Sequence, residues 1–531
     1  MNRFEWLSGY LAELEDEHIV VHSGSGEALA PAHLLHVDPE DWAKAAVVAK
    51  NMDLRWAGIW GDEQAGEIVL SAVVARPGAY LVLRTAVPLE RPQIASHAAI
   101  YPAANRMERH LADMLGVRFT DHPDGRRWTR HQAWDESQYP LRADFPLQGL
   151  DPKRTPADSD YPFPPIQGSG VYEIPVGPVH AGTIEPGHFR FQAAGEPILR
   201  VEERLGYTHK GIEKIAVGRD ADGLARIAGR ISGDSCVAHT WAACQALERA
   251  CGIKPPERAS LIRGLLCERE RVANHLGDIG SICNDVGFSF ALMQCHALRE
   301  QWLRRNLDLS GHRLMMNSLV PGGVALDVDA GVIETLRQDH AQLRAQIRPL
   351  FDIFDDHPSL EDRLLGTGRL SPETAKLLGV SGYVGKASGQ AIDLRKDALY
   401  APYTRLQFNV AQSQAGDVAA RLAIRQEEVH SSLNLMDEML GMLERLKDQQ
   451  GLHVDLPARP GGEGLGLIEG WRGEIISYVR LDRDCRVARF FARDPSWFTW
   501  PALEQLLPGN IVPDFPVCNK SVNGSYSGHD L

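Results

Sequence analysis

Two long apolar stripes at helical spacing constrain the fold of this 531-residue chain most. In residues 333–354, and again in residues 418–443, apolar side chains recur at alternating intervals of three and four. This spacing puts them on one face of an α-helix, and such a face has to be buried against another element. The two segments therefore predict a pair of antiparallel helices in a bundle. Pro349 is a candidate position for a kink, and we expect His340, which lies in the stripe, to be a hydrogen-bonded core histidine.

A proline-rich stretch divides the chain into two parts. Residues 147–170 contain five prolines among Asp, Ser and Gly residues. Proline removes backbone donors and favours extended conformations, so this stretch predicts a domain linker. Residues 1–146 then form one domain and residues 171–531 a second one.

The first domain predicts α/β structure. Its residues 68–75 and 79–87 are rich in aliphatic and β-branched side chains and flank an Arg-Pro-Gly turn, which predicts a β-hairpin. A helical pattern follows over residues 105–115.

The second domain predicts a mainly α-helical bundle with small β elements. It opens with a predicted β-hairpin over residues 173–191, whose tip would hold His180, Glu185 and His188. Shorter helices are expected over residues 235–250 and 256–285. The fold class of the whole chain is therefore α+β.

Composition excludes several functional classes. The net charge of −14 argues against a nucleic-acid surface, which needs clustered Lys and Arg. The first residues have no apolar signal core, and no stretch has the roughly 18 consecutive apolar residues of a membrane span. Eight cysteines occur without a C-x-x-C pair, so ferredoxin-type clusters and zinc ribbons are not expected. We expect a cytoplasmic protein with reduced thiols.

Several short motifs follow one another in a fixed order. They are Gly177–His180, Gly206–Lys214, Arg230–His239, Gly389–Asp397, Gly416–Arg421, Glu469–Glu474 and Ser521–Leu531, with residues 116–127 and 140–146 in the first domain. In this order the chain resembles the family in which the 30-kDa-type and 49-kDa-type subunits of respiratory complex I are fused. That family includes the large subunits of group 4 nickel-iron hydrogenases.

The resemblance implies that a metal centre has been lost. In the hydrogenase pattern the second-domain motif near residue 232 and the C-terminal motif each supply two cysteines, and the four thiolates hold nickel and iron. The corresponding residues here are Ser232, Ser235, Ser525 and Gly528. A serine hydroxyl is a weak, hard ligand and glycine has no side chain, so we expect no nickel. The chain stops at Leu531 without the tail that such subunits lose after metal insertion, and we expect no such maturation.

The residues of the first ligand motif allow other interpretations. Ser232 is a candidate helix N-cap, and Ser235 and Asp234 are candidates to accept the first helical amides. A zinc site is a further hypothesis, because two thiols and two imidazoles could make a tetrahedral set. Its members would be Cys236, His239, Cys518 and His529.

Complex I relatives use the corresponding pocket for quinone. In that family a tyrosine occupies the position of Gly233, so the phenol expected to donate to a quinone carbonyl is absent here. His180 and His188 are the candidates for the hairpin histidine. Quinone binding stays an alternative, whereas NADH would be bound by another subunit, because this chain has no Gly-rich dinucleotide fingerprint.

Several titratable residues would surround the pocket that the family resemblance implies. Carboxylates and imidazoles that lie close together shift one another's pKa and can pass protons. We expect Arg472 to pair with Glu469 or Asp417. The candidate catalytic residues are His180, Glu185, His188, His239, Asp417, Glu469 and Arg472, with Glu213 as a further titratable group.

The resemblance implies a subunit of a membrane-associated oxidoreductase complex, peripheral on the inner face of the cell membrane. Its partners would be an iron-sulfur small subunit, a ferredoxin-like subunit and antiporter-like membrane subunits, with the iron-sulfur clusters in the partners. The complex would couple electron transfer to proton or ion translocation without nickel. The alternatives are a non-catalytic scaffold, an NADH:quinone-type subunit that uses the former metal pocket, and a free-standing enzyme with a rewired zinc or iron site.

Overall fold

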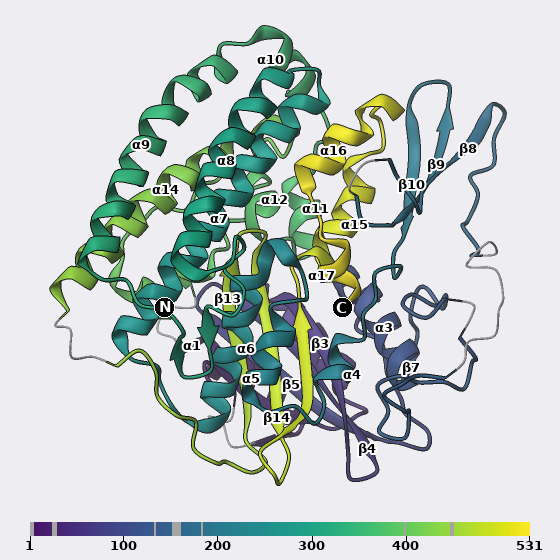
Figure 1. Cartoon of the computed structure of the whole chain (residues 1–531). Coiled ribbons are helices and arrows are strands. Elements are labelled where there is room, and N and C mark those ends of the chain that lie inside the picture. Colours follow the sequence, from purple (N-terminus) through teal and green to yellow (C-terminus); the bar gives the residue numbers. More distant parts are fainter. Residues whose placement is uncertain are drawn as a thin grey trace.

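The computed structural model describes residues 5–23, 29–131, 134–150, 161–181, 184–397, 400–446 and 451–531. Its fold class is α+β, as the sequence predicts. Long helices form a bundle on one side, and the strands of the two larger sheets lie beneath them (Figure 1). Residues 151–160 of the predicted linker lie outside the described residues, so the linker stays a prediction.

The N-terminal part is built on one five-stranded sheet of order β1-β2-β5-β4-β3. Strands β4 and β5 pair antiparallel from Glu67↔Pro88 to Arg76↔Ala79, which confirms the predicted hairpin. Nearly every residue of β5 is buried, because side chains cover both faces of the sheet. The elements of this part are α1 (Glu5–Asp16), β1 (Val21–Ser23), β2 (Ala32–Val37), α2 (Trp42–Asn51), β3 (Arg55–Gln64), β4 (Glu67–Arg76), β5 (Ala79–Pro88), β6 (Gln93–Ala95), the 3₁₀ turn η1 (Pro102–Ala104), α3 (Asn105–Leu115) and β7 (Arg118–Thr120).

A three-stranded sheet opens the second part. Strand β8 (Val171–Val176) pairs antiparallel with β9 (His188–Ala194), which confirms the predicted hairpin, and β9 pairs with β10 (Ile198–Arg204). Residues 182–183 at the hairpin tip lie outside the described residues. Two short helices follow, α4 (Ile212–Ala216) and α5 (Ala221–Ala228).

The bundle contains both helices that the apolar stripes predict. Helix α9 (Ala330–Asp355) lies antiparallel to α14 (Val418–Arg445), because Arg337 bonds to Glu444 whereas Arg344 bonds to Asn434. His340 is buried, and its Nδ1 lies 2.6 Å from Asp437 Oδ1, so the expected core histidine is confirmed. The other bundle helices are α6 (Cys236–Cys251), α7 (Glu257–Asp285) and α8 (Ser289–Ser310).

Helix α6 packs very closely on a second antiparallel sheet, β13-β14-β15. A Cβ at Gly464 or Gly466 would lie only 2.1 Å from Ala246 O or 1.9 Å from Ala242 O, so only glycine fits there. This contact brings the first turn of α6 beside the turn between β13 (Glu463–Gly470) and β14 (Gly473–Leu481).

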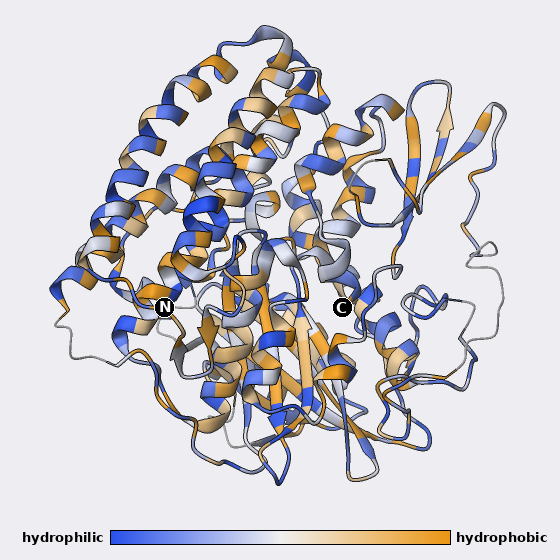
Figure 2. Ribbon diagram, viewed as in Figure 1, coloured by the Kyte–Doolittle hydropathy of each residue, from blue (hydrophilic) through white to orange (hydrophobic). Residues whose placement is uncertain are grey.

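Short elements complete the chain. They are η2 (Gly233–Ser235), β11 (Leu319–Val320), β12 (Gly323–Val324), α10 (Pro358–Leu364), α11 (Pro372–Leu377), α12 (Gly382–Ala387), α13 (Leu394–Asp397), η3 (Tyr403–Arg405), β15 (Val487–Arg493), α15 (Ser496–Leu506), η4 (Val512–Asp514), α16 (Phe515–Val522) and α17 (Tyr526–Asp530). In Figure 2 the sheet strands are mainly hydrophobic, whereas α9 alternates in hydropathy along its length. Within the described ranges, no helix has the length and apolarity that a membrane crossing requires.

The N-terminal sheet and the β13-β14-β15 sheet are joined by buried side chains. The Trp60 ring lies 4.9 Å from that of Tyr478 and 5.3 Å from that of Phe491. Three ion pairs cross the same interface: Asp62 with Arg480 at 2.5 Å, Arg84 with Glu463 at 2.9 Å and Arg55 with Glu474 at 2.6 Å. The two parts therefore share one continuous core.

A candidate site at the four ligand positions

Three segments that are distant in sequence meet at one place: the start of α6, the β13–β14 turn and the C-terminal segment that begins α17. The hydroxyls of Ser232 and Ser525 lie 2.9 Å apart across this junction. Gly382, with φ of +63°, lets α12 approach the β13–β14 turn, because a Cβ there would be 1.8 Å from Arg472 O. We call Ser232, Ser235, Ser525 and Gly528, with Asp234 and Arg472, the ligand-position site.

An ion pair lies at the centre of the ligand-position site. The guanidinium of Arg472 donates two parallel hydrogen bonds to the Asp234 carboxylate, at 2.8 and 2.6 Å. It also donates to Asn523 O at 2.7 Å and to Ser235 Oγ at 3.2 Å, and it lies 4.0 Å from the centre of the Trp471 ring. Burial alone would raise the pKa of Asp234, but the charge and hydrogen bonds of Arg472 outweigh it and hold that pKa below its ordinary value.

The pairing predicted for Arg472 is therefore wrong. Its carboxylate partner is Asp234, which precedes α6, and neither Glu469 nor Asp417. The reason is geometric, because the packing of α6 on β13 brings residue 234 to the turn that carries Arg472.

The hydroxyls of all three serines in the site already take part in hydrogen bonds. Ser232 Oγ donates to Asp234 Oδ1 at 2.6 Å. Ser235 Oγ lies 3.0 Å from the donating indole nitrogen of Trp471. Ser525 Oγ accepts from Gly528 N at 2.9 Å and so caps α17. Hydroxyls in such bonds form a polar network rather than a set of metal ligands.

Ser232 and Ser235 occupy the N-cap positions of η2 and α6, but neither side chain accepts a helix amide, so the side-chain capping predicted for them and for Asp234 is wrong. The first amides of α6, those of Val237 and Ala238, donate instead to the Glu270 carboxylate at 2.7 and 3.1 Å. Glu270 comes from the neighbouring helix α7, and burial raises its pKa to about 8.

His239 lies behind the ligand-position site. Its Nε2 is 2.8 Å from Asp494 Oδ2, and both side chains are buried. Burial would raise the pKa of Asp494, but the hydrogen bond and charge of His239 and the charge of Arg472 outweigh it and lower that pKa. A Cβ at Gly528 would be 2.8 Å from Asp494 Cγ and 3.0 Å from Ser525 Cβ, so no side chain fits at this position without a shift.

The residues present do not fit a nickel-iron centre. Such a centre needs soft thiolate donors, and this site offers three hydroxyls already bonded to one another or to their neighbours. The fourth position, Gly528, has no room even for a methyl group.

The zinc hypothesis is wrong as well. Cys236 Sγ donates to Leu314 O at 2.6 Å, whereas Cys518 lies against Gly368. His529 accepts from the Trp128 indole at 3.2 Å. Across the described ranges, no three or more His, Cys, Asp and Glu side chains form a group that could hold a metal ion.

The β8–β9 hairpin contributes one predicted residue directly to this region. Glu185 accepts a hydrogen bond at 3.1 Å from Ser527 N, next to Ser525. His180 and His188 bond instead within the hairpin, to Gly187 O at 2.7 Å and to Gly177 O at 3.1 Å. Burial lowers the pKa of His188 despite that bond.

Two predicted titratable residues lie in other surroundings. Asp417 is the N-cap of α14 and accepts from Ala420 N at 2.8 Å and from Gly366 N at 2.9 Å. Glu213 bonds to Arg489 at 2.9 Å and lies 3.3 Å from His110, at the contact with the N-terminal part. Neither is bonded to the ligand-position site.

Glu469 belongs to a buried charged group that we call the Lys386 cluster. Its members are Lys386, Asp393, Glu428 and Glu469, with His275, Glu268, Arg271 and Arg395 around them. Lys386 Nζ lies 2.7 Å from Asp393, 2.7 Å from Glu428 and 3.7 Å from Glu469. Burial, and next the charge of Asp393, raise the pKa of Glu469 to about 8. Its Oε1 has no hydrogen-bond partner among the described residues, whereas Oε2 accepts from Leu394 N at 3.0 Å.

Aromatic rings and hydrogen bonds connect the Lys386 cluster to the ligand-position site. His275 lies 2.6 Å from Glu428, and its ring is 5.9 Å from that of Trp471. A separate path leads from the site to Asp278 of α7 outside the cluster: Asp278 accepts from Asn523 at 2.8 Å, and Asn523 O accepts from Arg472.

Sequence reasoning missed Asp494, Lys386, Glu428 and His275. One signal was available, because Glu428 lies three residues after Arg425 on the helical stripe that predicts α14, where a buried charge requires a partner. Those partners come from α7 and α12, so the chain order alone does not indicate them.

Family descriptions match three successive segments of the chain. "Respiratory-chain NADH dehydrogenase, 30 Kd subunit" matches residues 35–151, "Nickel-dependent hydrogenase" matches residues 210–277 and "Respiratory-chain NADH dehydrogenase, 49 Kd subunit" matches residues 285–458.

Similar proteins cover most of the chain. Formate hydrogenlyase subunit 5 of Escherichia coli is 32% identical over 85% of this chain and 79% of its own length. The NADH-quinone oxidoreductase C/D protein of Phocaeicola vulgatus is 29% identical over 80% of this chain and 84% of its own. A protein in the structure of the archaeal membrane-bound sulfane sulfur reductase, a respiratory membrane complex, aligns with a TM-score of 0.64 and 26% identity over 68% of this chain and 99% of its own. The chain therefore belongs to the family of complex I-like and hydrogenase large-subunit-like oxidoreductase subunits, in which 30-kDa-type and 49-kDa-type domains are fused.

Proposed function

We propose that this chain is the nickel-free large subunit of a membrane-associated complex of the complex I and hydrogenase type. In this complex, electrons from an iron-sulfur partner are coupled to the movement of protons or other ions. The ligand-position site occupies the position of the metal centre, and it transfers protons instead of reacting with molecular hydrogen. Family membership supports the assignment to such a complex, and the site's own chemistry supports the proton role.

The Asp234–Arg472 ion pair carries this proposal. It lies among the hydroxyls of Ser232, Ser235 and Ser525, where relatives of the hydrogenase type would place thiolates. A carboxylate bonded to hydroxyls can accept and pass protons along the bonds, whereas hydroxyls hold redox metals poorly.

The Lys386 cluster gives the site a neighbouring proton store. It contains four carboxylates, of Glu268, Asp393, Glu428 and Glu469, and three cations, of Lys386, Arg271 and Arg395, all of them buried. One proton on the cluster therefore balances its charge. Glu469 is the carboxyl whose pKa, raised to about 8, keeps that proton at neutral pH. Release of this proton would leave a net negative charge next to the ligand-position site.

The proposed partners follow from the relatives. The names of the relatives include a formate hydrogenlyase, an NADH-quinone oxidoreductase and a respiratory membrane complex. By this similarity we assign to the complex an iron-sulfur small subunit, a ferredoxin-like subunit and antiporter-like membrane subunits, with this chain peripheral on the cytoplasmic face. Iron-sulfur clusters belong to the partners, and any NADH would be bound by another subunit.

The test compares variants of the native complex, with activity measured in inverted membrane vesicles and assembly measured after affinity purification. We expect Asp234→Asn and Arg472→Gln to reduce electron transfer and proton uptake in inverted membrane vesicles at least about tenfold, because each removes a charge-assisted pair. Asp417→Asn is the matched control, since it retains a cap on α14 away from the site. Equal co-purification of the partner subunits shows that assembly is intact.

A scaffold function is the second candidate. The hydrogen bonds that already occupy Ser232, Ser235 and Ser525 favour it, because a packed network needs no substrate. A scaffold predicts that the Asp234→Asn complex assembles and turns over at the control rate. That result would contradict the proton role. A quinone-type reaction is less favoured, because His180 and His188 are both bonded within their own hairpin and position 233 is glycine.

A further inference from the structure

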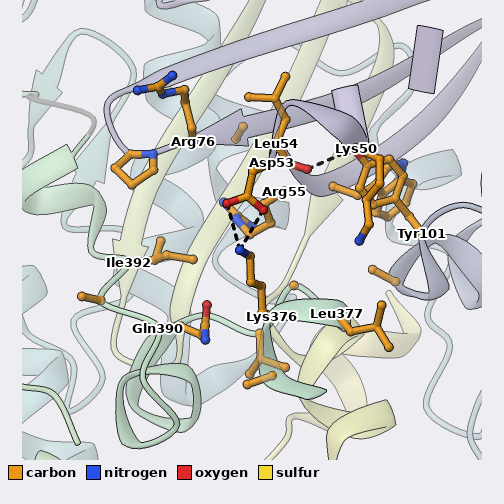
Figure 3. A pocket seen from close by; sticks show the side chains of 18 of the residues that line it. Lys50, Asp53, Leu54, Arg55, Arg76, Tyr101, Lys376, Leu377, Gln390 and Ile392 are labelled. Carbon is orange, nitrogen blue, oxygen red and sulfur yellow. Dashed lines mark hydrogen bonds and ion pairs between the residues drawn. The ribbon is translucent and has the colours of Figure 1, made fainter. Parts of the chain in front are cut away.

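A cavity of about 420 Å³ lies between the N-terminal part and the helical part. The end of α2, the β4–β5 turn and η1 line one side, and α11 with the loop around residues 389–392 lines the other (Figure 3). The volume is in the range of small-molecule sites, and a junction between two parts is a common place for such a site.

The walls of this cavity combine apolar surface with positive charge. Leu54, Trp56, Val380 and Ile392 contribute apolar surface, and Tyr80 and Tyr101 add aromatic rings. The cations are Lys50, Arg55, Arg76 and Lys376, and the anions are Asp53 and Asp397. The lining thus carries four positive and two negative groups.

The two acids are already engaged. Lys376 lies 2.7 Å from Asp53, and these two residues face each other across the cavity in Figure 3. Asp397 Oδ2 accepts a hydrogen bond from Asp393 N at 3.0 Å. Lys50 Nζ lies 5.0 Å from the centre of the Tyr101 ring. Lys376 is engaged by Asp53 and Arg55 by Glu474, so an entering anion would meet its positive charge chiefly from Lys50 and Arg76, beside aromatic surface.

Arg55 has a donor without a partner at this cavity. Its Nη2 donates to Glu474 at 2.6 Å, but its buried Nη1 has no hydrogen-bond partner among the described residues. Glu474 also accepts from Tyr80 at 2.6 Å and from Arg493. A buried guanidinium N–H that lacks an acceptor is costly, but this nitrogen is closed off from solvent, so an anionic oxygen would satisfy it only after the surrounding side chains shift.

We propose that this cavity is a binding site for a small aromatic anion, with the ring system against Trp56, Tyr101 and Ile392 and the anionic group attracted chiefly by Lys50 and Arg76. The shared chemistry is a flat ring bearing a carboxylate or a phosphate. The proposal does not depend on the redox role of the complex.

A ligand bound in this cavity would affect the ligand-position site through Glu474. Arg55 and Arg493 share Glu474, which follows the Arg472–Gly473 turn by one residue. Asp494, the next residue after Arg493, holds His239. A ligand that binds Arg55 thus acts on the groups that fix this turn.

Calorimetric titration of the purified full-length chain tests the site. The probes are 2-naphthoate and AMP, which represent the carboxylate and the phosphate, and uncharged 2-naphthamide is the control ligand. We expect saturable binding of at least one anion and affinity at least about tenfold weaker for the amide.

Variants locate the binding. Arg76→Gln should weaken affinity about tenfold, and Ile392→Trp, which fills the apolar wall, should abolish binding while the melting temperature shows that the chain is folded. Lys44→Gln is the control, because Lys44 lies on α2 and is paired with Asp41 outside the cavity. Three results would each overturn the proposal: no saturable binding of either anion at millimolar concentration, equal affinity for the amide, or unchanged affinity in both cavity variants.

Discussion

At the scale of single residues, a charge-balanced hydrogen-bond network occupies the positions at which the resemblance to nickel-iron hydrogenases implies soft ligands. Arg472 is only 5% exposed, so its guanidinium needs an anionic partner, and Asp234 supplies the charge that thiolates would supply in a hydrogenase-type relative. Asp494 plays the corresponding part for His239. This pairing explains how a buried arginine is accommodated at a site that offers hydroxyls and no thiolates.

Gly528 gives the first prediction. We expect Ser525→Cys to lower the free energy of unfolding by about 1 kcal/mol, because a thiol is a weaker partner than the hydroxyl that bonds to Gly528 N and Ser232 Oγ. Gly528→Cys should destabilise by about 1–3 kcal/mol, because its Cβ would be 2.8 Å from Asp494 Cγ. Chemical denaturation of each variant and of the parent measures both costs, and a Gly528→Cys variant as stable as the parent would show that position 528 has room for a ligand.

Glu469 gives a prediction on pH dependence. Its pKa of about 8 in the folded chain lies above the 4.5 of an ordinary glutamate, so the folded chain holds a proton that the unfolded chain releases. The stability that this protonated carboxyl contributes is complete below pH 4.5 and is lost as the pH rises through 8. Glu469→Gln mimics the neutral acid, so its melting temperature should fall less than that of the parent between about pH 5 and 9.

The exposed Glu438→Gln variant on α14 controls for the removal of a charge. Parallel melting-temperature curves for the parent and Glu469→Gln would contradict a raised pKa at Glu469.

At the scale of helices and strands, local sequence patterns predicted five helices and two hairpins, whereas α8 and the β13-β14-β15 sheet were not predicted. Apolar spacing is a property of neighbouring residues, so it can be recognised in the sequence alone. It indicated the helices over residues 333–354 and 418–443, and helices were also predicted over residues 105–115, 235–250 and 256–285. The caps were not predicted in the same way. Glu270 caps α6 from another helix, and a contact of this kind depends on tertiary packing rather than on the neighbouring sequence.

The position of Asp417 leads to a prediction at this scale. Because its carboxylate caps α14, Asp417→Ala should lower the free energy of unfolding by about 1–2 kcal/mol, whereas Asp417→Asn should cost less. Denaturation measures both values. Turnover of the assembled complex should be the same in the two variants, and a loss of turnover with unchanged stability would return Asp417 to the catalytic residues.

At the scale of the whole molecule, the sequence predicted the α+β class and the family. The interface between the N-terminal sheet and the β13-β14-β15 sheet was not predicted. Asp62, Arg84 and Arg55 each look like ordinary strand charges in the sequence. Their partners, Arg480, Glu463 and Glu474, lie about four hundred residues further along the chain. The candidate site shows the same limit, since Asp234 and Arg472 meet only through the packing of α6 on β13.

This interface predicts cooperative unfolding. Because aromatic rings and buried ion pairs connect the two sheets, calorimetry of the full-length chain should show one main transition. Arg480→Gln should lower the temperature of that transition without dividing it. Two well-separated transitions in the parent chain would contradict a shared core.

The central claim is that the ligand-position site works without nickel. Metal quantification of the purified native complex, combined with a hydrogen-uptake assay on the same sample, tests it most directly. With Ser232, Ser235 and Ser525 in hydrogen bonds and no room at Gly528, we predict nickel far below one atom per chain and no hydrogen uptake. One nickel per chain together with hydrogen uptake would contradict the account.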